Sequence, residues 1–165
     1  MELHTYTRHW THRVPDWPAA AVAGLAAGAV LMVLELLWSV FFVGTEPWRI
    51  THMVAAIVMG PDALQVSDFS VRLMATALAT HYVLGIIFGL VLAALIATFH
   101  LDSSPGKALL SGAVFALALY LLNFYGMVAV FPWFADMRGW TTVAAHLIFG
   151  MTVAIIYRQL ERPEQ

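Results

Sequence analysis

Four long apolar segments constrain this chain more than any other feature of its sequence. They cover about residues 19–43, 72–98, 107–131 and 140–157. A helix of roughly 20 apolar residues crosses the hydrocarbon core of a bilayer. Hydrophobic residues make up 61% of the chain and charged residues 11%, whereas roughly a quarter of the residues in a soluble domain are charged. The sequence therefore predicts an all-α integral membrane protein, a four-helix bundle.

Three further segments complete the predicted organisation. A polar arm occupies residues 1–18 and is expected in the cytoplasm, the membrane domain covers residues 19–158, and a charged tail covers residues 159–165. The turn at residues 101–106 is short, which predicts that the third span is an antiparallel neighbour of the second.

A short amphipathic helix is expected in the interface after the first span, over residues 47–59. Its predicted apolar stripe contains Ile50, Met53, Val54 and Ile57, and Arg49 and His52 lie on its other side. Ser67-Asp68 is the expected cap of the next helix.

The distribution of lysine and arginine predicts the orientation of the spans. Five such residues fall on the side shared by both termini and three on the other, namely Arg8, Arg13, Lys107, Arg158 and Arg162 against Arg49, Arg72 and Arg138. We therefore expect a multi-pass inner-membrane protein with both termini in the cytoplasm.

Each predicted span carries one polar side chain at a similar depth: Glu35, His81, Asn123 and His146. At a rise of about 1.5 Å per residue, these positions lie roughly 9–14 Å below the same membrane face. Polar and ionisable residues within a membrane are unfavourable unless they have partners, so they indicate a function by default. The four residues are predicted to form one buried site.

Small residues accompany both histidines on the same helical face. Gly85 and Gly89 follow His81 at intervals of four, and Gly150 follows His146. Small residues at this spacing let membrane helices approach closely.

The two halves of the chain resemble each other. Gly28 and the later Pro47-Trp48 align with Gly112 and Pro132-Trp133, and the histidine motifs follow in the same order. This indicates a two-span unit duplicated in parallel orientation, which would place the two histidines opposite each other. Chance similarity between apolar segments is the alternative.

Three interpretations of the site remain open, besides an enzyme acting on lipid or quinone. In the first, the polar cluster only fixes helix packing, and the chain is a small accessory subunit, without catalytic activity of its own, of a larger membrane complex such as an electron-transfer complex. In the second, the histidines are axial ligands of a b-type haem. The residues assigned to that haem are His81, His146, Gly85, Gly89, Gly150, Arg72 and Arg138.

The third interpretation is a divalent-metal or proton site. Two imidazoles and a carboxylate suit zinc, iron or copper, and histidine changes charge near neutral pH, which suits proton transfer. The residues of this site would be Glu35, His81, His146 and Asn123.

Other classes of function are excluded. The chain has no cysteine, so it has no thiolate ligand or cysteine nucleophile, and its net charge of −2 gives no sign of nucleic-acid binding. No nucleophile elbow, phosphate loop or zinc-protease helix is present. The expected partners are the lipid bilayer and either other membrane subunits or further copies of the chain.

The motifs also resemble a known group of proteins. Glu35 in the first span, the Pro47-Trp48 connection, and the stretches around His81 and His146 (THYVLG and AHLIFG) are similar to those of small, uncharacterised bacterial four-span proteins. The resemblance implies a bacterial inner-membrane protein and implies no activity.

Overall fold

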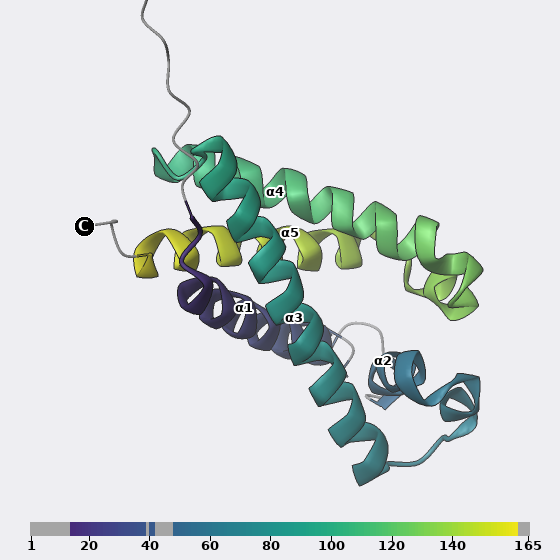
Figure 1. The fold of residues 1–165 in the computed structure, drawn as a ribbon. Coiled ribbons are helices and arrows are strands. Elements are labelled where there is room, and N and C mark those ends of the chain that lie inside the picture. Colours follow the sequence, from purple (N-terminus) through teal and green to yellow (C-terminus); the bar gives the residue numbers. More distant parts are fainter. Residues whose placement is uncertain (1–13, 39, 42–47, 162–165) are drawn as a thin grey trace, which may run out of the picture.

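The computed structural model describes residues 14–38, 40–41 and 48–161, and it contains no strand in these ranges. Figure 1 shows the arrangement of the helices. Four of them are long and apolar enough to cross a membrane: α1 (Trp17–Trp38), α3 (Val71–Phe99), α4 (Pro105–Leu121), which short helical turns extend to Ala129, and α5 (Trp140–Leu160). The predicted class, a membrane protein of four helices, is therefore confirmed.

The predicted boundaries are close to those observed wherever the structure describes the chain. The second and fourth spans begin within one residue of the expected positions. The arm up to residue 13, including His4, His9 and His12, lies outside the described residues, as do positions 42–47 and 162–165.

Three helices begin with a side-chain cap. The carboxylate of Asp16 accepts a hydrogen bond from the Ala19 amide at 3.0 Å, and the hydroxyl of Ser104 accepts one from Lys107 at 3.2 Å. Helix α3 is capped by Ser70, whose hydroxyl accepts from Leu73 at 3.4 Å. The cap predicted at Ser67-Asp68 is thus wrong by two to three residues, because an extended stretch still precedes the helix there.

The bundle consists of two helix pairs, α1 with α3 and α4 with α5, which are joined by contacts between α1 and α5. Helices α3 and α4 share a short turn but diverge from it (Figure 1) and make few contacts with each other. The prediction that these two spans are close antiparallel neighbours is therefore wrong. Membrane helices approach each other closely where small residues lie between them. The small residues of α3 face α1, and those of α4 face α5.

Glycines set the distance between α1 and α3. A methyl group on Gly24 would overlap the Gly85 carbonyl oxygen, and one on Gly89 would come within 2.7 Å of the Gly24 Cα. The two backbones are therefore in direct contact, which only glycine permits here.

The same construction joins α4 to α5. A methyl group on Gly112 would overlap the Gly150 carbonyl oxygen, and one on Gly150 would overlap the carbonyl oxygen of Gly112. Both contacts lie in the half of the bundle that holds the described ends of the chain. This half is tightly packed with small and aromatic residues, including Ala20, Ala93, Val153, Ala154 and Tyr157.

Helix α2 (Trp48–Met59) packs against α3. Its buried face contains His52 (6% exposed), Met53, Ala55 and Ala56. The amphipathic pattern placed His52 on the polar side of the helix, which is wrong. The helix turns its small residues towards α3, and this brings His52 into the buried face.

Candidate functional site

The four polar residues predicted to cluster line one cavity of about 100 Å³, here called the inner chamber. Glu35 comes from α1, His81 from α3, His146 from α5, and Asn123 from the π-helical segment η3 (Leu122–Gly126) that continues α4. Most of the remaining wall is apolar, and it includes four aromatic side chains: Phe88, Phe124, Phe134 and Phe149. The structure thus brings one polar group from each span to the same place.

Each histidine of the inner chamber binds a backbone carbonyl through one ring nitrogen. His81 uses Nε2 to reach the Gly28 carbonyl oxygen at 2.9 Å, and His146 uses Nδ1 to reach that of Thr142 at 2.9 Å. A carbonyl only accepts hydrogen bonds, so the nitrogen must carry the proton in each case. In the neutral rings, Nδ1 of His81 and Nε2 of His146 are then acceptors.

Glu35 and Asn123 make no hydrogen bond or ion pair with another described residue, and no buried side-chain oxygen or nitrogen of the described chain lacks a partner. The polar atoms of both side chains are therefore accessible from the cavities that they line. Glu35 also borders a second cavity of about 130 Å³ between α1, α2 and α3, which it shares with His81.

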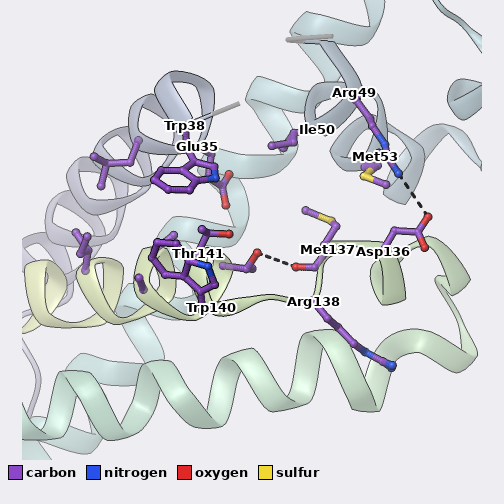
Figure 2. A pocket seen from close by; sticks show the side chains of 15 residues that line it. Glu35, Trp38, Arg49, Ile50, Met53, Asp136, Met137, Arg138, Trp140 and Thr141 are labelled. Atoms are coloured by element: carbon purple, nitrogen blue, oxygen red, sulfur yellow. Dashed lines mark hydrogen bonds and ion pairs between the residues drawn. The ribbon is translucent and has the colours of Figure 1, made fainter. Parts of the chain in front are cut away.

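A third and larger cavity, here called the outer pocket, has a volume of about 350 Å³ and also has Glu35 in its wall. It lies between α1, α2, the turn η5 (Pro132–Met137) and α5. Figure 2 shows the Glu35 carboxylate beside Trp38 and directed into this pocket. Glu35 therefore stands between the outer pocket and the inner chamber.

Arg49 and Asp136 form an ion pair across the outer pocket, with 3.7 Å between nitrogen and oxygen. Both side chains are more than half exposed. The charge of Arg49 is thus balanced at this point and is not directed at Glu35 (Figure 2).

Arg138 secures the π-helical segment rather than a ligand. Its Nε donates to the Phe124 carbonyl oxygen at 2.7 Å, and its guanidinium carbon lies 4.3 Å from the centre of the Tyr125 ring. π-Helical turns leave a backbone carbonyl without its usual partner and occur frequently at functional sites. The arginine therefore stabilises the turn that presents Asn123 to the inner chamber.

The residues assigned to a haem do not form a haem site. The inner chamber, at about 100 Å³, has room for only several water molecules at about 30 Å³ each, which is far less than a porphyrin needs. Gly85, Gly89 and Gly150 contact neighbouring helices, so helices occupy the space expected for the macrocycle. Arg138 is bound to η3 and Arg72 is exposed at the start of α3, outside these cavities.

The metal interpretation also lacks the geometry that it requires. Within the described residues, no three histidine, aspartate or glutamate side chains lie close enough together to hold a metal ion. Glu35, His81 and His146 border one chamber without converging on a single point.

The sequence did not identify the outer pocket. Its walls include Trp38, Arg49, Asp136 and Met137, which come from separate elements with no common motif. The available signal was Trp38, the tryptophan at the end of the first span. This signal was not specific, because a tryptophan at that position is equally typical of a membrane-interface belt.

Comparison of the chain with protein-family models, with curated proteins and with solved structures gives no match.

Proposed function

We propose that this chain is a membrane protein that binds protons in the inner chamber and receives them from one membrane face through Glu35. The observation that carries the proposal is the inner chamber itself, in which one polar side chain from each span meets inside the bundle.

The groups that line the inner chamber favour an occupant that donates hydrogen bonds. The Glu35 carboxylate accepts, and so does one ring nitrogen of each neutral histidine. Water, the hydrated proton and small protonated molecules are such donors. The chamber has room for several waters, which can connect the carboxylate to the imidazoles.

The arrangement favours access from one face only. Glu35 borders the outer pocket on the side of Arg49 and Asp136. On the other side, the glycine contacts and the buried alanines fill the bundle. The other ring nitrogen of each histidine, Nε2 of His81 and Nδ1 of His146, donates its hydrogen bond to a backbone carbonyl. A carbonyl cannot pass a proton onward. The histidines therefore store protons rather than conduct them across the membrane.

We also infer that the chain is a duplicated two-span unit, in a register that differs from the sequence alignment by one turn. The capping pair Asp16 and Ser104 and the contact pair Gly24 and Gly112 are each separated by the same number of residues as Glu35 and Asn123. In this register, Asn123 is the counterpart of Glu35. His146 becomes the counterpart of His81 once the additional residues of the first connection are treated as an insertion. The carboxylate thus distinguishes the two halves, and it lies on the side of the outer pocket.

The location in an inner membrane with cytoplasmic termini is part of the proposal, and the excess of basic residues on the terminal side supports it. The role as an accessory subunit stays a prediction. Recovery of a partner in fixed stoichiometry after mild solubilisation would support that role.

The test of proton binding is a pH jump on the purified protein in lipid nanodiscs. Imidazole infrared bands of isotope-labelled histidine report the protonation of the rings, and His81→Gln and His146→Gln assign the bands. We expect both rings to gain a proton on acidification. In Glu35→Gln the gain should be slower by roughly 10²-fold, because a positioned acid–base group is lost.

Asp62→Asn is the matched control, because Asp62 is an exposed carboxylate outside these cavities, and it should leave the rate unchanged. An unchanged rate in Glu35→Gln would contradict the role of the carboxylate. Rings that stay neutral at every pH at which the protein is folded would contradict proton binding.

A further inference from the structure

Two charged side chains that line the outer pocket form no ion pair with another described residue, namely Glu35 and Arg138. Arg49 and Asp136 pair with each other. Arg138 also lines the pocket, but its guanidinium group binds the Phe124 carbonyl oxygen and the Tyr125 ring. Figure 2 shows Arg138 directed away from the space into which Glu35 points. Glu35 is therefore the charged side chain without an ion-pair partner that points into the pocket.

The walls around this carboxylate are aromatic and aliphatic. Trp38 and Trp140 meet edge to face, with 5.3 Å between ring centres and an interplanar angle of 81°. Ile50, Met53 and Met137 line the opposite side. A tryptophan face attracts a cation as well as an apolar group. These walls therefore suit a molecule that carries a positive charge and also has an apolar body.

The size and position of the outer pocket also suit a small ligand. Its volume of about 350 Å³ lies at the lower end of the range for small-molecule sites, roughly 300–1,000 Å³. Trp140, at 72% exposure, forms part of its wall. Tryptophan is typical of the membrane–water interface, where amphiphilic molecules accumulate.

We propose that the outer pocket binds a small amphiphilic cation, with its charged head at the Glu35 carboxylate and its apolar body between the two tryptophans and α2. This inference goes beyond the proposed proton site. The two share Glu35, but cation binding does not require the histidines of the inner chamber.

The probe for this proposal is benzyltrimethylammonium, which combines an aromatic ring with a fixed positive charge. Its carbon isostere, neopentylbenzene, has nearly the same shape and no charge. Equilibrium dialysis against the full chain in nanodiscs, corrected with empty nanodiscs, measures the binding of each. We expect one cation per chain and an affinity at least tenfold higher than that of the isostere.

Two variants test the residues. Glu35→Gln should reduce cation affinity at least tenfold and leave that of the isostere within twofold, whereas Asp62→Asn should change neither. Ala144→Leu, which adds bulk to the pocket wall, should weaken both probes. Retained helical circular dichroism and a single elution peak show that each variant is folded.

Equal affinity for cation and isostere, an unchanged affinity in Glu35→Gln, or no binding of the cation would each overturn the proposal. The readout is separate from the infrared test of the histidines. If the unsubstituted chain takes up protons at its histidines but does not bind the cation, this inference alone is contradicted. If it binds the cation but its histidines stay neutral, the proton site alone is contradicted.

Discussion

At the scale of single residues, the polar side chains that line the inner chamber could be identified from the sequence, because each is isolated among apolar neighbours. Glu35, His81, Asn123 and His146 line one chamber, as their depth along the spans predicted. The sequence could not predict which ring nitrogen of each histidine is hydrogen-bonded, because this depends on which backbone carbonyl lies within reach. For His81 that carbonyl belongs to Gly28 of another helix.

Gly24 provides the sharpest prediction at the scale of the residue. The Cβ of Gly24→Ala would overlap the Gly85 carbonyl oxygen and come within 3.0 Å of the Ile86 Cα. These are backbone atoms, so they can yield only if the two helices separate. We expect a loss of about 1–3 kcal/mol in the free energy of unfolding, measured by denaturation in mixed micelles.

Gly106→Ala is the matched control, because a methyl group there meets nothing within 4 Å. It should leave the free energy of unfolding the same or slightly higher, since alanine restricts the unfolded chain. Equal losses in both variants would contradict the assigned backbone contact.

At the scale of the element, the most informative feature is the change from α-helix to π-helix at the end of α4. The apolar pattern predicted one continuous span to residue 131, whereas the α-helix ends at Leu121 and η3 follows. The hydrophobic period does not distinguish these windings over so few residues. The contact that accompanies the π-helical turn comes from Arg138, which lies in a later loop.

Arg138→Gln should loosen this segment. It removes the hydrogen bond to the Phe124 carbonyl oxygen and the contact with the Tyr125 ring. Because Arg138 is exposed, we expect a modest loss of about 1 kcal/mol in the free energy of unfolding. Amide hydrogen exchange in residues 122–126 should become faster, and mass spectrometry of peptides from this region measures it.

Arg72→Gln serves as the comparison for the same loss of charge. Arg72 is exposed in the first turn of α3, where a positive charge is unfavourable to the helix dipole. Its removal should leave exchange in residues 122–126 unchanged. Faster exchange in both variants would mean that net charge, rather than the Arg138 contact, protects the segment.

At the scale of the whole molecule, two helix pairs meet through α1 and α5. The turn before α4 and the segment after α2 lie at opposite ends of α3 (Figure 1). If α3 crosses the membrane, these two segments face opposite sides. The proposed orientation places the turn in the cytoplasm.

The absence of cysteine from the sequence makes this topology directly testable. Gly106→Cys and Asp62→Cys each introduce a single thiol at an exposed position. A membrane-impermeant maleimide applied to intact, outer-membrane-permeabilised cells should label Asp62→Cys. Gly106→Cys should be labelled only after the inner membrane is opened. Labelling of both before lysis would contradict the four-span topology, and the reverse pattern would contradict the orientation.

The sequence by itself determined the number of spans, their approximate limits and the polar residues inside them. These depend on local hydrophobicity and on the cost of placing a polar group in hydrocarbon, which can be read without knowing any neighbour. Only the tertiary structure decided which helices pair, the burial of His52, the binding of Arg138 to η3, and the outer pocket beside Glu35. Contacts between segments that are far apart in the chain decided these features, and such contacts cannot be read from local hydrophobicity.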